Sequence, residues 1–449
     1  MSNRKAAVLD MTKGNAVRMI LTFAIPLFIG NIFQQVYSMV DTMVAGYCLG
    51  DQAIAAIGST SSLYWLVIDL SWGLNSGFAL IVTQAFGAHE QGKIRKSIGH
   101  MMVLDGIITA VLTIPALIFL PSLMRLMNTP ENIFDQAYSY MVVIFAGLPA
   151  TICYNMFAGI LRAFGNSRTP LYFLIFSSLL NIALDLLFVA VFRMGVGGAA
   201  LATVVAQAVS GVLAGSYVYR NYRGMIPAKE DFRLEKDLTK EMIATGGAMG
   251  FMYSVVDLGS VVFQGAANTL GGMYIAAHTA ARRIINILMQ PMSSMMNASG
   301  TFVGQNWGAK QKQRIRDTLI KMIGMEIAWG LFSCLIVYLF GGEIIRFTTG
   351  TQSKEILDNA VMSLHIHLPF FPVLGVLLVL RISMQSIGQK TAPVISSVIE
   401  LLMKIIAVLW IIPSFGFVGV CVTEPVTWVV MTAFLITVYL VKTRKILAG

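Results

Sequence analysis

The stretch Leu171–Phe192, LYFLIFSSLLNIALDLLFVAVF, decides the class of fold. Its 22 residues carry one charge, Asp185, and are otherwise apolar except for two serines and an asparagine. A helix needs about 20 mostly apolar residues to cross the hydrocarbon core of a bilayer. The stretch therefore predicts a transmembrane helix with one acidic side chain inside it.

Runs of the same kind recur along all 449 residues, of which 56% are hydrophobic and only 12% are charged. Soluble domains carry roughly 25% charged residues, so we predict an all-α, multi-pass membrane protein. We expect twelve spans, at 17–45, 53–82, 98–121, 134–158, 169–192, 196–219, 241–268, 273–303, 318–340, 357–381, 392–412 and 416–441.

The sequence repeats once. Gln84–Ala88 (QAFGA) matches Gln305–Ala309 (QNWGA) at an offset of 221 residues, and each is followed by a basic run. Six spans separate equivalent points, so the halves share one orientation and are related by a pseudo-two-fold axis along the membrane normal. We expect an N-lobe at 1–220, a connector at 221–240 and a C-lobe at 241–449, with substrate bound between the lobes.

The net charge of +10 indicates topology and not nucleic-acid binding. With a cytoplasmic N-terminus, 25 of the 32 Lys and Arg residues lie at cytoplasmic ends or loops, which is the positive-inside pattern. We therefore expect both termini in the cytoplasm and a location in the cell membrane. The loop at 220–240 mixes both signs of charge and predicts a solvated connector.

Acidic side chains inside the membrane are costly and mark functional sites. Asp41 and Asp185 lie at similar depth near the outer ends of spans 1 and 5, and Thr203 reaches the same depth in span 6. Tyr37 and Asn181 each stand one turn before an acid, on its face. This oxygen-rich cluster predicts a site for H⁺ or for Na⁺, and the alternative is a hydrogen-bonded plug that only joins helices.

The C-half carries a different set of charges. Glu400 precedes Lys404 by one turn, a spacing that allows an internal salt bridge and leaves a functional role for Glu400 as the alternative. Arg282 and Arg283 need acidic partners. We expect the further cavity or C-lobe residues to be Asp69, Asp257, Glu400, Glu424, Arg282 and Arg283.

Three other features complete the set of candidates. Pro26 interrupts span 1 and can act as a hinge. Asp105 and Glu326 occupy equivalent positions in the two halves, and we expect them to pair with nearby basic loops. His365 and His367 lack ligands at suitable spacing, so we expect no metal site.

These residues resemble the MATE (multidrug and toxic compound extrusion) family, of the bacterial DinF-like type. The matching positions run through nearly the whole chain: Pro26, Gln34-Gln35-Val36-Tyr37, Asp41-Thr42, Gly46 and Gly50; Gln84 and Gly87-Ala88; Arg162, Gly165-Asn166 and Pro170; and Asn181 with Leu184-Asp185. The resemblance implies two six-helix lobes around a V-shaped cavity, with ion-coupled export of organic cations or other amphipathic compounds.

The resemblance also implies roles for single residues. The ion site of the family's N-lobe falls on Tyr37, Asn181, Asp185 and Thr203 together with Asp41, and bending at Pro26 is one implied switch. The family's NorM-type branch has a C-lobe cation site with an acid in helix 10. We do not expect that site here, because the interior of the tenth span contains no acid.

We therefore predict a monomeric secondary-active multidrug antiporter that uses H⁺ or Na⁺ and no cofactor. Nucleotide-binding, hydrolase and zinc-protease motifs are absent from the sequence, which argues against an enzyme. One alternative is a flippase for lipid-linked saccharides from the same superfamily, although the few basic residues in the spans disfavour it. The other is a membrane scaffold or receptor that transports nothing.

Overall fold

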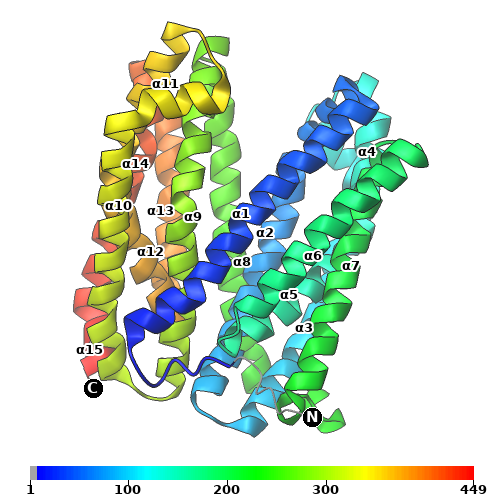
Figure 1. Ribbon diagram of the computed structural model, residues 1–449. Coiled ribbons are helices and arrows are strands. Elements are labelled where there is room, and N and C mark those ends of the chain that lie inside the picture. Colours follow the sequence, from blue (N-terminus) through cyan, green and yellow to red (C-terminus); the bar gives the residue numbers. More distant parts are fainter. Residues whose placement is uncertain (1–7, 449) are drawn as a thin grey trace. The chain divides into compact units, whose positions relative to one another are not determined.

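The computed structural model describes residues 8–448, which form helices joined by short connections and contain no β-strand (Figure 1). The first half of the chain contains α1 (Ala16–Leu49), α2 (Asp51–Gly87), α3 (Gln91–Leu126), α4 (Glu131–Ala146), α5 (Leu148–Ala163), α6 (Arg168–Asp185) and α7 (Gly195–Asn221). A π-helical turn, Leu186–Val191, extends α6.

The second half contains α8 (Lys236–Asn268), α9 (Gly272–Gly308), α10 (Lys312–Thr349), α11 (Lys354–His367), α12 (Phe371–Ser386), α13 (Thr391–Ile406), α14 (Ile412–Val438) and α15 (Arg444–Ala448). Short 3₁₀ turns lie at Arg223–Met225, Lys229–Phe232 and Leu368–Phe370, and π-helical turns at Ala407–Ile411 and Tyr439–Thr443.

The described residues form two compact units. Residues 8–11 and 25–250 make unit 1, and residues 12–24 and 251–448 make unit 2. The boundaries thus fall inside α1 and α8 and not in loops. The first of them, between Ala24 and Ile25, lies next to Pro26. The lobe boundaries at 220 and 240 stay a prediction.

The twelve predicted spans are found among the described helices. Nine segments are long and apolar enough to cross a bilayer, and α4 with α5 makes a tenth that is bent by 45°. The segment Thr391–Leu447 contains two predicted spans, which Gly416 separates with φ 57° and ψ −131°. The remaining span is α9, whose length suffices but whose sequence is more polar than the others.

The bend between α4 and α5 has a local cause. Gly147 lies at the break, and a Cβ atom placed there would be 2.1 Å from Val204 of α7. Pro149 follows in the first turn of α5, where its missing N–H costs no hydrogen bond. The predicted span 134–158 is therefore a broken helix.

Lipid-facing surface is recognisable on α3. Ile107, Val111, Ile114 and Ile118 recur every three or four residues and are 50–65% exposed. In water such a stripe would be unfavourable, whereas lipid tails solvate it at no cost. Buried apolar side chains at the other faces of the helices hold unit 1 together.

Most side chains of the connector at 221–240 are exposed, as expected, and a few of them dock on the first turns of α3. Asp231 is buried and lies 3.6 Å from Arg95, and the Glu235 carboxylate accepts a 2.6 Å hydrogen bond from Lys96. The backbone N–H of Glu235 donates to Nε2 of the buried His100, at 2.8 Å. These contacts join the connector to unit 1.

Candidate ion site and charged clusters

The side chains of Asp41 on α1 and Asp185 on α6 meet in unit 1. Their carboxyl groups lie close enough for one to hydrogen-bond to the other. Asp185 is fully buried, and apart from Asp41 no group among residues 8–448 hydrogen-bonds to either of its oxygens. Ionised carboxylates only accept hydrogen bonds, so this contact is satisfied only when the pair holds a proton.

Two further polar side chains of the predicted cluster contact each other. Asn181, one turn before Asp185, donates from Nδ2 to the Thr203 hydroxyl of α7 at 3.5 Å, a long contact. The Thr203 hydroxyl donates to the carbonyl of Ala199 at 3.2 Å. The amide oxygen of Asn181 is buried and accepts no hydrogen bond from the described chain. These oxygens remain available to a cation.

Tyrosines surround the acidic pair, and only one of them was predicted. Tyr37 interacts electrostatically with both acids, and so does Tyr140 of α4. Tyr64 of α2 adjoins Tyr37 and Asp41. The sequence does carry a signal for Tyr140, because its depth below the outer end of α4 is similar to that of Asp41 in α1.

Backbone features position this site. Asp185 is the last residue of α6, and the π-helical turn begins directly after it. Such turns are frequent at functional sites. Pro26 is buried within α1, which continues through it as a helix. The proline lacks an N–H to bond to the carbonyl of Thr22, so α1 is weakened at the boundary between the units.

Asp105 and Glu326 do not pair with basic loops, so that expectation was wrong. Both are buried, and neither carboxyl group has a hydrogen-bond partner within residues 8–448. Asp105 lies near Cys153 of α5, and Gly375 of α12 packs against the backbone and Cβ of Glu326. The close packing of neighbouring helices keeps basic side chains away from them.

Unit 2 contains a buried ion-pair network. Arg282 of α9 donates to the Glu424 carboxylate of α14, and His367 Nε2 lies 3.6 Å from the same carboxylate. The imidazole Nδ1 of His367 is 2.8 Å from the carbonyl of Ser363. Sequence reasoning considered His367 only as a metal ligand and missed its contact with Glu424.

A second pair in unit 2 follows the predicted spacing. Lys404 lies 3.0 Å from Glu400, one turn earlier on α13, and also donates to Ser260 of α8 at 3.0 Å. The Lys404 side chain is 4% exposed, so both partners help to offset the burial of its charge. This arrangement is what a structural link between two helices requires.

The remaining predicted residues lie on three different helices. Asp69 of α2 is half-buried near Tyr64, and Asp257 is half-buried on α8. Arg283 is exposed, and no described residue pairs with it. The expectation that both arginines of α9 find acidic partners was therefore right for Arg282 and wrong for Arg283.

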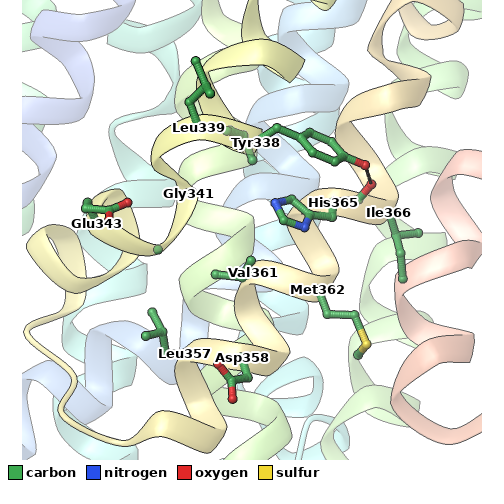
Figure 2. A pocket seen from close by; sticks show the side chains of 12 residues that line it. Tyr338, Leu339, Gly341, Glu343, Leu357, Asp358, Val361, Met362, His365 and Ile366 are labelled. Carbon is green, nitrogen blue, oxygen red and sulfur yellow. Dashed lines mark hydrogen bonds between the residues drawn. The ribbon is translucent and has the colours of Figure 1, made fainter.

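A groove of about 590 Å³ lies between α10 and α11 in unit 2. Figure 2 shows Tyr338 beside His365, and the Tyr338 hydroxyl donates to the carbonyl of His365 at 3.1 Å. Glu343 and Asp358 also line it. None of the predicted ion-site residues lies in this groove, and among residues 8–448 no cluster of three or more His, Cys, Asp or Glu has the arrangement of a metal site.

The MatE family model matches the chain twice, at residues 26–187 and 248–410. The two matches begin 222 residues apart, close to the repeat offset in the sequence. Together they cover well over half of the chain.

Among curated proteins, the chain is 25% identical over 395 residues to the "Probable multidrug resistance protein YoeA" of Bacillus subtilis (strain 168), covering 86% of this chain and 85% of the relative. It is 25% identical over 376 residues to the "DNA damage-inducible protein F" of Escherichia coli (strain K12), covering 79% and 76%. A solved structure, described as "Crystal structure of MATE in the bent conformation", superposes with a TM-score of 0.90, covering 99% of this chain and 100% of that one at 22% identity.

Proposed function

Because this chain belongs to the MatE family, we infer that it is a multidrug efflux transporter, and we propose that proton entry through Asp41 and Asp185 drives the export. The proposed substrates are amphipathic organic compounds, cationic ones among them. Both termini lie in the cytoplasm, and the protein acts as a monomer without a cofactor.

The direct contact between the Asp41 and Asp185 carboxyl groups carries this proposal. Two carboxylates this close repel each other when both are ionised, and a single shared proton removes the repulsion. Asp185 has no other hydrogen-bonding partner in the described chain, so occupancy by a proton changes the local energy strongly. A site whose energy depends on its ion in this way is suited to coupling ion entry to the export of a substrate.

In the proposed cycle, the outward-open protein takes a proton at the pair and releases the exported compound. The neutral pair lets the protein turn to its inward-open state, with α1 bending at Pro26. The proton then leaves to the cytoplasm and a new substrate molecule binds. Differential binding of the proton to the two states biases the cycle in the direction of export.

Sodium is the second candidate ion, because Tyr37, Asn181 and Thr203 add oxygens to the two carboxylates. Na⁺ needs several oxygens at once and leaves both acids ionised, whereas two neighbouring carboxyl groups can share a proton. We therefore favour H⁺. A flippase for lipid-linked saccharides and a scaffold that transports nothing are the alternatives, and neither requires the acidic pair.

The test uses the purified protein in proteoliposomes loaded with a fluorescent amphipathic dye. Proton and sodium gradients are imposed separately on the wild type and on Asp41→Asn and Asp185→Asn. We expect dye movement with a proton gradient alone, and its loss in both variants. Asp135→Asn is the matched control, because Asp135 is an exposed acid on α4 of the same unit.

Two results would refute the proposal. Unchanged proton-driven transport in both Asn variants would remove the acidic pair from the mechanism. Dye movement driven by a sodium gradient and not by a proton gradient would show that the coupling ion is Na⁺.

A further inference from the structure

The helix α9 has a polar face along most of its length. Its members follow an alternating spacing of four and three residues, which places them in one stripe on a helix. Thr279, Arg283 and Asn286 are exposed, and the others are half-buried. The stripe consists of Thr279, Arg283, Asn286, Gln290, Ser293 and Asn297.

The exposed face of α3 has the same spacing and the opposite chemistry. Its stripe, from Ile107 to Ile118, is wholly apolar and suits lipid. Guanidinium and amide groups facing lipid tails have no hydrogen-bonding partners, so charged and strongly polar residues in membrane helices face protein or a water-filled cavity. The polar stripe of α9 therefore faces water.

Arg283 lies too deep for its head to rest easily among lipid headgroups. It is 11 residues from the start of α9 at Gly272, which is about 16 Å along the helix. Asn286 and Gln290 lie deeper on the same face, and amides have no long stem with which to reach the surface. A water-filled path explains all three side chains together.

The neighbouring arginine shows what is unusual about Arg283. Arg282 points about 100° away around the helix and is paired with Glu424. Arg283 has neither an ion pair nor a hydrogen bond with any residue in the described part of the chain. Its charge remains available, and the stripe around it contains no acid to neutralise it.

We propose that Arg283, with Asn286 and Gln290, binds a carboxylate or phosphate group on the compounds that the protein exports. A guanidinium group offers several N–H donors in one plane and matches the two oxygens of such an anion. The side-chain amides add donors one and two turns deeper, and the exposed Ile287 beside them provides an apolar contact. The exported compounds are thus anionic or zwitterionic amphiphiles, and not only cations.

This inference rests on the proposed function, because it describes the substrate of the same transporter. Its test measures binding and uses no gradient. The full chain is placed in nanodiscs of phosphatidylcholine and titrated with two xanthene dyes. One dye carries a free carboxylate, and the other is its methyl ester, which lacks that charge and adds one methyl group.

We expect Arg283→Gln to weaken binding of the carboxylate dye by about tenfold or more, since hydrogen bonds to charged groups are strong. The affinity for the ester should change by less than about twofold. Arg283→Lys keeps the charge but loses the planar guanidinium group, so its affinity for the carboxylate dye should lie between those of the wild type and Arg283→Gln. Arg346→Gln is the matched control, because Arg346 is an exposed arginine of the same unit.

Equal effects on both dyes, or no effect of Arg283→Gln on the carboxylate dye, would overturn the inference. So would failure of the wild type to bind the carboxylate dye. Nanodiscs containing phosphatidylglycerol form a further arm. We expect the anionic lipid to displace the carboxylate dye from the wild type and from Arg346→Gln. If it displaces the dye equally from Arg283→Gln, the dye site does not depend on Arg283 and the inference fails.

The two proposals fail in different ways. If transport proves independent of the proton gradient while the difference between the dyes persists, the coupling mechanism is wrong and the anion site stands. If coupling through Asp41 and Asp185 is found but the dyes bind alike to Arg283→Gln and the wild type, only the anion site is wrong.

Discussion

Gly77 lies where the α2 and α8 backbones of unit 1 cross. Gly73 meets Gly250, and Gly77 meets Gly246, so each helix presents two glycines four residues apart. A Cβ atom at position 77 would lie 2.5 Å from the Cα of Gly246, and one at position 73 would lie 2.7 Å from the Cα of Gly250. Small residues at such spacing let membrane helices approach closely.

The Gly77→Ala substitution therefore forces the two helices apart. Ordinary van der Waals contact begins at 3.4 Å, so a Cβ atom at 2.5 Å requires a displacement of about 0.9 Å. The atoms it meets are backbone atoms of Gly246 and cannot turn aside. We expect a loss of about 1–3 kcal/mol, which is typical of overpacked sites, offset by up to about 1 kcal/mol because alanine is the better helix former.

Thermal denaturation of the purified protein, followed by tryptophan fluorescence, measures this loss as a lower midpoint. The matched control is Gly58→Ala on the same helix, where an added Cβ would meet nothing within 4 Å. We expect the control to denature at the same temperature as the wild type or higher. If Gly77→Ala and Gly58→Ala have equal midpoints, the close crossing of α2 and α8 is not a source of stability.

Three further predictions follow from contacts within each unit. Glu424→Gln leaves the charge of Arg282 without its partner and should lower the free energy of unfolding by about 2 kcal/mol. This is below the usual range for buried pairs because Arg282 is 33% exposed. The thermal midpoint should partly recover when Arg282→Gln is added, and a purely additive loss in the double variant would contradict this. The hydrogen bond from Lys96 lowers the pKa of Glu235. The bond therefore stabilises the folded state above the unfolded-state pKa of Glu235, and this effect is lost as the pH falls through the folded-state pKa. The difference in thermal midpoint between the wild type and Glu235→Gln should vanish in acid, and a difference that stays constant with pH would refute the prediction. Pro26→Ala restores a backbone hydrogen bond in α1 and should slow transport without weakening dye binding, whereas an unchanged rate would exclude a hinge there.

The helical architecture could be read from the sequence because hydrophobic length is a direct physical requirement of the bilayer. Leu171–Phe192 and its counterparts specify spans without reference to packing. The same rule underrates α9, whose polar stripe makes it the least apolar span, and it gives no warning of the bend at Gly147. The close packing of Gly147 against Val204, which is 57 residues away in the chain, cannot be read from hydrophobic length.

The candidate ion site was predicted by comparing depths in neighbouring spans, which needs only the helix ends and the rise per residue. It brought together Asp41 and Asp185 correctly, and depth alone also indicates Tyr140. Depth does not say which way a side chain points around its helix. This is why Arg282 and Arg283 received the same expectation, and why Asp105 and Glu326 were assigned to loops that they do not reach.

The direction in which a side chain points around its helix cannot be read from its depth in the membrane. This direction accounts for the different chemistry of the two units. Equivalent positions 105 and 326 keep equivalent environments, since both are buried carboxyls facing closely packed helices. In unit 1 two acids turn toward each other, which is the arrangement on which the proposed proton site rests. In unit 2 the acids Glu400 and Glu424 turn toward cations and are already neutralised. The exposed charge left in α9 is therefore positive, so the proposed proton site and the proposed anion site belong to different units of one repeated fold.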